Sequence, residues 1–378
     1  MKKTYDAIVI GGGVNGGAIA FNLAKRGMKV LLLEKDGLAS KASGAAAGML
    51  GAQAELDGEG PLFQLARTSR GMFTDLADEL KMTSGIDIGL VNKGMLRLAL
   101  TDWEQQEHHR ISEIHKQNGE LAELLTGEEA RKREPALSNE VIGAMYLEKD
   151  GQVAALQLAL GFLKSASALG CVIKEYVEVH SFHFSNGKVT GVATNEGDFM
   201  SSNVVVTGGA WSEKLLMKIG LQLKMYPVKG ECFSVRTEVP LLSSTIFTPG
   251  CYLVPKKGGR IIVGATVIPN TFNQQVTVEG ISLLMGNAKK LVPSISLAEW
   301  EGAWAGIRPQ TADGLPYLGE HPDYRGLFIA TGHYRNGILL SPITGEVMAD
   351  LIEGKSPSAD ISSFRIDRTT KEANPLRR

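Results

Sequence analysis

Residues 6–34 read DAIVIGGGVNGGAIAFNLAKRGMKVLLLE, and this stretch decides the fold. A short apolar run, Ala7 to Ile10, ends in three glycines, and a helical pattern follows that Gly27 closes. A second apolar run ends on Glu34. The order of strand, tight turn, helix and strand predicts one βαβ unit.

The glycines of this unit have the G-x-G-x-x-G spacing. Gly11 allows the tight turn, Gly13 lets a pyrophosphate approach the backbone, and Gly16 lets the helix pack closely on the strand. The free N–H groups and the dipole at the helix start favour phosphate. Glu34 ends the second strand, where an acid accepts hydrogen bonds from a ribose and disfavours the extra phosphate of NADP. We therefore predict a dinucleotide site rather than an ordinary glycine-rich turn, and the motif leaves FAD and NAD both open.

Composition narrows the class of protein. The 378 residues suffice for two domains, and the formal net charge of −1 indicates no nucleic-acid or anionic-membrane partner. The three cysteines, Cys171, Cys232 and Cys251, lack C-x-x-C spacing, so we expect buried thiols, no metal site and a reducing, cytoplasmic setting. No apolar run is long enough to predict a membrane span.

Residues 37–54, GLASKASGAAAGMLGAQA, are nearly all small. They are typical of a flexible loop or a tightly packed helix, or of backbone that lies against a flat ring system. We favour the ring, because the stretch directly follows the βαβ unit. Ser40 and Ser43 are placed to cap the next turn or to contact phosphate.

Hydrophobic periodicity predicts the remaining elements, with Thr126 as a helix N-cap and Asn186-Gly187 as a hairpin turn. We expect helices over 62–80, 102–116, 126–133, 153–170, 281–291 and 338–353. We expect strands over 86–90, 94–100, 144–147, 172–179, 188–194, 204–207, 228–235, 252–255, 260–266 and 327–331.

Parallel-type patterns occupy the start, middle and end of the chain, and antiparallel patterns lie between them. We therefore predict an α/β fold in which a discontinuous Rossmann-like nucleotide domain carries an inserted antiparallel-sheet substrate domain. The active site would lie between the two. The nucleotide domain takes residues 1–85, 145–222 and 307–378, and the substrate domain takes 86–144 and 223–306.

Five segments in order carry a resemblance to a known family. They read GGGVNGGAIAFNLAKRG with VLLLE, SGAAAGMLGA, VVVTGGAWS, WAGIRPQTADGLPYLG and GHYRNGILLSP. The chain resembles, over nearly its whole length, the flavin-dependent amine oxidases of the D-amino-acid oxidase and sarcosine oxidase group. Within that group it is similar to the bacillus-type glycine oxidase branch, which serves thiamine thiazole synthesis and forms homotetramers.

The resemblance implies FAD as the cofactor. Some relatives tether their flavin through a cysteine in the segment equivalent to 308–319; this chain has none there, so non-covalent binding is implied. It places Val177 near the adenine, residues 46–49 against the flavin ring and residues 337–339 at the pyrimidine edge. The implied cofactor-binding residues are Gly11, Gly13, Val14, Gly16, Glu34, Lys35, Ser43, Ala46, Ala47, Gly48, Met49, Val177, Gly208, Gly337, Ile338 and Leu339.

The resemblance also implies a small amino acid as the substrate. Arg308 would hold its carboxylate with a bidentate fork, Tyr252 would donate to the same group, and Arg335 would hold the substrate or its amine side. We nominate no general base, because the flavin performs the difficult step. His333 is interpreted as structural, with a direct role as the alternative.

The implied reaction is hydride transfer from the substrate Cα to flavin N5, which gives an imine. Oxygen then reoxidises the flavin to yield hydrogen peroxide, and water hydrolyses the imine to an oxo acid and ammonia or an amine. Two positions depart from the family pattern, which has histidine and methionine where this chain has Gly250 and Val267. We expect both to widen the pocket for sarcosine, D-alanine or D-proline.

Three other functions stay open. One is a dehydrogenase of the same fold that passes electrons to a quinone or carrier. The others are an NAD-linked dehydrogenase, which the flavin-family segments disfavour, and a module that binds a nucleotide without catalysis.

Overall fold

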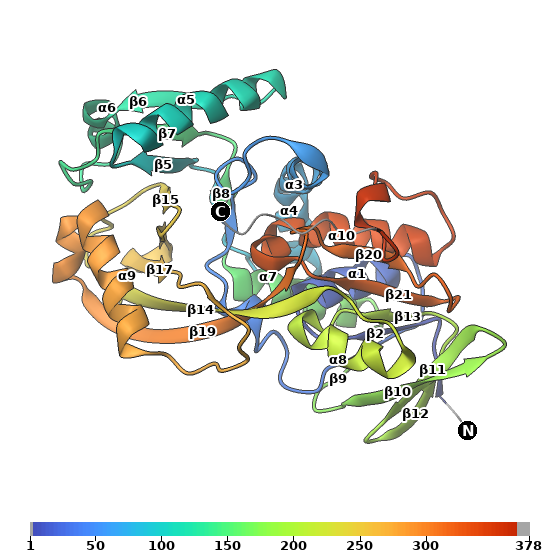
Figure 1. Cartoon of the computed structure of the whole chain (residues 1–378). Helices are drawn as coiled ribbons and strands as arrows, with labels where there is room; N and C mark the ends of the chain where they lie inside the picture. Colours follow the sequence, from blue (N-terminus) through green and yellow to red (C-terminus); the bar gives the residue numbers. More distant parts are fainter. Residues whose placement is uncertain (1–2, 369–378) are drawn as a thin grey trace.

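The computed structural model describes residues 3–368, which form three large sheets and a layer of helices (Figure 1). No helix in this range is long and apolar enough to cross a membrane.

The six-stranded sheet contains the predicted βαβ unit. Strand β2 (Ala7–Ile10) leads into helix α1 (Val14–Lys25), which returns the chain to β3 (Val30–Leu33). β2 lies between β3 and β13 and is parallel to both. Of the neighbouring pairs in this sheet, β20 and β21 alone are antiparallel. The other strands are β9 (Val172–Lys174), β13 (Val204–Val206), β20 (Tyr317–Glu320) and β21 (Leu327–Thr331).

Both faces of this sheet are covered, which explains why its strands read as continuous apolar runs. Ala7 and Val9 of β2 pack into the helical layer. Ile8 and Ile10, which point the other way, pack against the four-stranded sheet.

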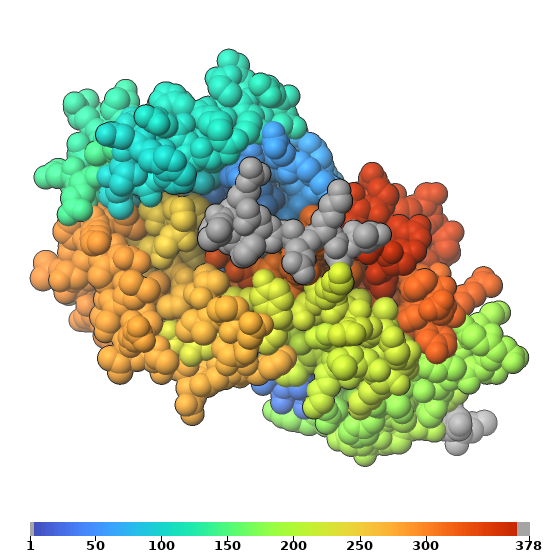
Figure 2. Space-filling model, viewed as in Figure 1, coloured from blue at the N-terminus to red at the C-terminus, as the bar shows by residue number. Residues whose placement is uncertain are grey.

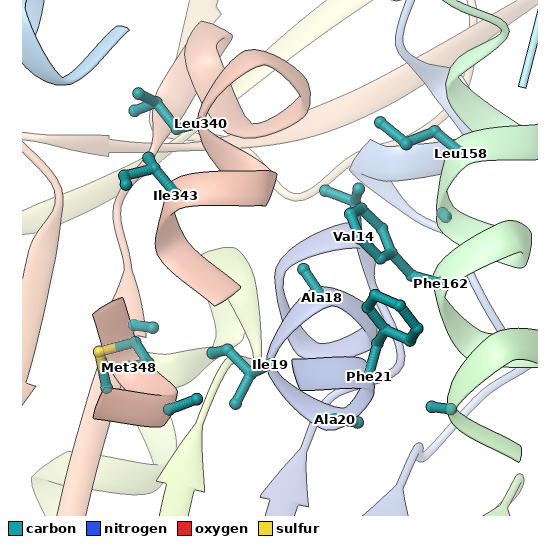
Figure 3. Close-up of a cluster of buried hydrophobic side chains, with 14 of the residues drawn as sticks. Val14, Ala18, Ile19, Ala20, Phe21, Leu158, Phe162, Leu340, Ile343 and Met348 are labelled. Atoms are coloured by element: carbon teal, nitrogen blue, oxygen red, sulfur yellow. The ribbon is translucent and has the colours of Figure 1, made fainter. Parts of the chain in front are cut away.

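The helical layer is built around α1, which lies between α7 (Ala155–Ala168) and α10 (Gly337–Ile352). Figure 3 shows Phe21 of α1 facing Phe162 of α7, with ring centroids 5.9 Å apart, while Ile19 faces the α10 side. A methyl group added at Gly345 of α10 would lie 2.7 Å from the Ala18 carbonyl oxygen, so the two helices need a glycine to pack this closely.

The four-stranded sheet covers the opposite face. Its hairpin turns at Asn186 and Gly187, which have φ values of 50° and 73°, and this confirms the predicted turn. The strand predicted over 172–179 is confirmed for residues 172–174, which form β9, and is wrong beyond them. The chain leaves β9 through Tyr176, whose φ is 60°, and enters another sheet at Val179. The strands are β1 (Lys3–Thr4), β10 (Val179–Ser185), β11 (Lys188–Thr194) and β12 (Gly197–Met200).

The nine-stranded sheet lies at the other end of the molecule and is mostly antiparallel. Its longest pair, β14 with β19, runs in register from Met225 opposite Thr311 to Arg236 opposite Glu299. The strands are β5 (Met95–Ala99), β6 (Glu123–Thr126), β7 (Gly143–Leu147), β14 (Met225–Arg236), β15 (Thr245–Thr248), β16 (Cys251–Pro255), β17 (Arg260–Gly264), β18 (Ile268–Pro269) and β19 (Glu299–Thr311).

Two further element predictions need correction. The segment 86–90 forms no strand; its Ile88 carbonyl instead accepts a hydrogen bond from the Ala154 N–H ahead of α7. The predicted helix over 62–80 is two helices that meet at Met72.

Thr126 is confirmed as an N-cap, with a reciprocal capping box to Glu129. The remaining helices and the short strand pair are α2 (Ala42–Ala45), α3 (Gly60–Gly71), α4 (Phe73–Ser84), α5 (Asp102–Gln117), α6 (Gly127–Arg133), α8 (Ser212–Leu216), α9 (Val278–Leu291), β4 (Met49–Leu50) and β8 (Gly151–Gln152).

The two largest sheets are each built from segments that lie far apart in the sequence, as a discontinuous fold requires. Strands from the start, middle and end build the six-stranded sheet, and two intervening stretches build the nine-stranded one. Figure 2 shows the second set, residues 100–145 and 260–300, gathered at one end of the molecule. The predicted borders at 144/145 and 306/307 fall inside β7 and β19, and the division into two domains stays our proposal.

Candidate active site

The turn between β2 and α1 forms one end of a cavity of about 300 Å³. Gly11 has a φ of 114°, and a methyl group there would lie 2.8 Å from the Thr207 carbonyl oxygen. A methyl group on Gly16 would overlap the Gly11 carbonyl oxygen. Gly16 therefore packs α1 on the turn and does not itself line the cavity, whereas Gly11 and Gly13 do.

Glu34 holds this turn in place. Its carboxylate accepts hydrogen bonds from the Gly12 N–H at 2.7 Å and the Asp36 N–H at 2.8 Å. The Ser43 hydroxyl likewise accepts the Val14 N–H at 2.9 Å. Both acceptors line the cavity, so the loop is preorganised where a polar ligand would bind.

The small-residue stretch forms the middle of the cavity wall. The Trp304 indole N–H of β19 donates to the Ala45 carbonyl at 2.9 Å, and a methyl group on Gly306 would lie 2.8 Å from the Ala45 Cβ. Gly48 has a φ of 88° and packs against the Val153 backbone. The stretch is thus tightly packed rather than a flexible loop, and its residues 45–49 line the cavity.

The start of α10 closes the same wall. Gly337 and Ile338 line the cavity. Leu339 does not; its side chain lies in the helical core, and its carbonyl accepts the Ser69 hydroxyl at 2.6 Å. The cofactor-binding residues implied by the resemblance that line the cavity are Gly11, Gly13, Val14, Glu34, Lys35, Ser43, Ala46, Ala47, Gly48, Met49, Val177, Gly208, Gly337 and Ile338.

Arg308 lies at the other end of the cavity, on β19. Its Nη1 donates to the Thr266 carbonyl at 3.2 Å. A methyl group on Gly230 of β14 would overlap the guanidinium, so that glycine provides the space in which the fork lies. In the β14–β19 register Gly230 pairs with Gly306, which makes Arg308 its diagonal neighbour.

Tyr252 of β16 lines the same end. Its hydroxyl lies 3.3 Å from the Cys232 Sγ, and its register partner Gly264 leaves the space that the ring occupies. Burial raises the pKa of Tyr252 well above its usual value, so the hydroxyl keeps its proton near neutral pH and is available as a donor.

Arg335 precedes α10 and also lines this end, with its guanidinium 5.2 Å from the Tyr334 ring centroid. The structure therefore brings the three predicted substrate residues to one cavity. It adds Glu55, which the sequence analysis did not single out. Burial raises the pKa of the Glu55 carboxyl to about 7, against the opposing effect of Arg335 and Arg308.

Three other residues of the sequence analysis are now placed. His333 lines the cavity, but burial lowers its pKa to about 4 and its Nε2 lies 3.1 Å from the Thr344 hydroxyl, which favours a structural role. Gly250 lines the cavity as expected. Val267 does not: it is 49% exposed, because the buried side chain at this turn is that of Thr266. The expectation that Val267 widens the pocket is wrong.

The comparisons with known proteins agree with this geometry. The family model described as DAO, FAD dependent oxidoreductase, matches residues 6–351. The chain belongs to this family. Glycine oxidase of Geobacillus kaustophilus is 48% identical over 97% of this chain and 98% of that protein, and glycine oxidase of Bacillus subtilis is 37% identical over 99% of both. The crystal structure of the Geobacillus protein has a TM-score of 0.95 at 47% identity and covers 98% of this chain and 100% of its own.

The residues of this DAO-family chain fit FAD. The glycine turn leaves the room that a pyrophosphate needs, and the N-cap residue of the helix behind it, Gly13, has no side chain to fill that room. Asn15 in the first turn of α1 also lines the cavity, and its buried Oδ1 has no hydrogen-bond partner within residues 3–368. FAD is the cofactor of this family, and the cavity offers both the glycine cradle and an unsatisfied polar atom to hold it.

Proposed function

We propose that this chain oxidises glycine and other small primary or secondary amines, including sarcosine, D-alanine and D-proline. The products would be an oxo acid, ammonia or an amine, and hydrogen peroxide. One observation carries the proposal: Arg308, Tyr252 and Arg335 line the same cavity as the glycine turn, and Tyr252 is close enough to both arginines for their charges to affect one another's pKa values. The similarity to glycine oxidases over nearly the full chain supports the same substrate class.

The side chains have distinct parts in this proposal. Arg308 offers two parallel N–H donors to the substrate carboxylate, and its bond to the Thr266 carbonyl fixes the plane of the fork. Tyr252 adds a third donor from the neighbouring strand. With the carboxylate held at this end, the substrate Cα points toward the wall formed by residues 46–49 and the start of α10. When bound, FAD accepts two electrons there and is reoxidised by oxygen.

No protein base is required for this role. Of the titratable groups that line the substrate end, His333 already contacts Thr344, and the Tyr252 hydroxyl stays protonated. The Glu55 carboxyl also lines this end, and the proposal does not use it as a base. The chain's task is to orient the substrate and to keep the site dry. The uncapped start of α10 favours negative charge on whatever lies against Gly337.

The visible absorbance spectrum, recorded without oxygen before and after glycine is added, tests the proposal. A yellow protein whose blue-region band bleaches supports the cofactor and the substrate together. A yellow protein that does not bleach with glycine indicates that the substrate is a larger amine. A colourless protein that FAD does not reconstitute overturns the proposal.

A dehydrogenase of the same fold is the second candidate. The crystal structure of an L-proline dehydrogenase from P. horikoshii matches with a TM-score of 0.87 at 26% identity and covers 97% of this chain. Peroxide released in proportion to the glycine consumed supports the oxidase. Turnover that needs an added dye and releases no peroxide supports the dehydrogenase.

We also propose that the product imine serves thiamine thiazole synthesis. A bifunctional protein ThiO/ThiG of Synechocystis is 35% identical over 99% of this chain, which spans 56% of that longer protein. Restored growth without thiazole of a bacterial strain that lacks its own glycine oxidase tests this part. We further propose a homotetramer, which light scattering of the purified protein tests.

A further inference from the structure

Glu55 lies in the wall of the cavity, directly after the small-residue stretch. It is partly buried, and within residues 3–368 its carboxylate has no hydrogen-bond or ion-pair partner. Its oxygens are not among the fully buried unpaired side-chain atoms of residues 3–368, so they are accessible from the cavity. An acceptor of this kind in a cavity wall therefore indicates a donor that arrives with the ligand.

The charges around Glu55 define what that ligand is. Arg335 and Arg308 lie close enough to lower its pKa, and Asp150 raises it, while neither arginine is within pairing distance. The charge of Glu55 in turn raises the pKa of the Tyr252 hydroxyl. The substrate end of the cavity thus presents two arginines and one carboxyl group whose charged form an incoming ammonium group would favour, which is the complement of a zwitterion.

The backbone that carries Glu55 is held rigidly. The Asp150 carboxylate is fully buried and accepts the Gln53 N–H at 3.0 Å and the Ala54 N–H at 2.8 Å. Arg70 donates to the same carboxylate at 2.6 Å. Since two consecutive amides just before Glu55 are fixed from behind, the position of its Cα is set by the core rather than by a mobile loop.

We propose that Glu55 binds the ammonium group of the substrate while Arg308 binds its carboxylate. This inference rests on the proposed function. The two groups of an α-amino acid are separated by a single carbon, so an anionic and a cationic side chain in one small cavity select for that pair. Glu55 then makes the site prefer amino acids over ligands that carry the carboxylate alone, such as simple carboxylic acids and 2-hydroxy acids.

The test compares Glu55→Gln with Glu59→Gln in the FAD-loaded protein. Glu59 belongs to the same loop, but it is exposed and does not line the cavity, so it serves as the matched control. Glycine reports on both charged groups of the ligand, and acetate reports on the carboxylate alone. Acetate binding is followed as a change in the flavin absorbance spectrum, which needs no turnover.

For Glu55→Gln we expect the KM for glycine to rise roughly 10- to 100-fold, as for loss of a hydrogen bond between charged groups, with a smaller change in kcat. We expect the Kd of acetate to stay the same or to fall, because a repelling charge is gone. Glu55→Asp should recover part of the glycine affinity, and Glu59→Gln should match the unmodified protein.

Two results would overturn the assignment. One is a KM for glycine that stays within about twofold in Glu55→Gln at normal flavin content. The other is a parallel loss of glycine and acetate binding, which indicates a structural role. Failure of the proposed function is distinct from either, since the unmodified protein would then fail to bleach with glycine.

Discussion

Gly230→Ala removes no charge and no hydrogen-bonding group, yet we expect it to disable carboxylate binding. A methyl carbon at this position would lie closer than 3.0 Å to both terminal nitrogens and the central carbon of the Arg308 guanidinium. Ordinary contact begins at 3.4 Å. The sheet backbone on either side is paired and cannot yield, so the end of the arginine side chain has to move.

The required movement is about 1 Å, and displacements of this size in a positioning group cost about 100-fold in rate. We therefore expect kcat/KM for glycine to fall about 100-fold, which is roughly 2.7 kcal/mol of transition-state stabilisation. The fold should survive, because the group that moves is the end of a flexible side chain. Gly302→Ala on β19 is the matched control: its methyl group meets nothing within 4 Å, and we expect unchanged activity.

The assay is peroxide release at several glycine concentrations, with flavin content checked by absorbance. A double-mutant cycle with Arg308→Lys isolates the cause, because a lysine has no planar fork for the new methyl group to displace. In that background Gly230→Ala should cost less than about threefold. If Gly230→Ala alone keeps kcat/KM within threefold at full flavin content, Arg308 is not the carboxylate ligand that we infer.

Further predictions concern the cofactor, stability and substrate range. Gly16→Ala should lower the flavin content per protein, measured by absorbance, because the new methyl group overlaps the Gly11 carbonyl oxygen and pushes α1 off the turn. Burial lowers the pKa of His108 to about 4, so the unfolded chain takes up this proton first as the pH falls. Stability should therefore drop between about pH 6.5 and 4, by at most about 3 kcal/mol from this group, and chemical unfolding should show a shallower drop in His108→Phe but not in the exposed control His180→Phe. Gly250→His should reduce turnover of D-proline more than that of glycine, since a large side chain replaces a glycine of the cavity lining, whereas Val267→Met, outside the lining, should change neither.

The cofactor end of the site was predictable from the sequence because its rules are local. Strand, glycines and helix follow one another within a few residues, and Gly16 is required by a contact inside the same unit, with the Gly11 carbonyl oxygen. The apolar runs of β2 and β3 were equally clear, because both faces of a covered sheet are apolar. The substrate residues were predicted from the family resemblance. All three of them, Tyr252, Arg308 and Arg335, line the cavity.

Predictions failed where the signal was not local. The longest strand, β19, contains Gly302, Gly306 and Pro309, which in isolation argue against a strand. Its register with β14 explains one of them, because Gly306 makes room for Ala45 in the cavity wall. Met72 separates α3 from α4, and Gly71, the last residue of α3, is the one glycine at the junction; a single glycine within an apolar helical pattern is tolerated and does not by itself indicate a break.

Glu55 illustrates the same limit at the level of function. It stands in a run with Asp57 and Glu59, and composition alone reads all three as an exposed acidic loop. The buried Asp150 carboxylate holds the backbone of residues 53 and 54 from behind, and of these three acids Glu55 alone lines the cavity. A residue whose importance depends on a contact made 95 positions away has no signature in its neighbours. The substrate end of this site is therefore a property of sheet register and of one buried carboxylate, and those are the places where variants will separate substrate choice from cofactor binding.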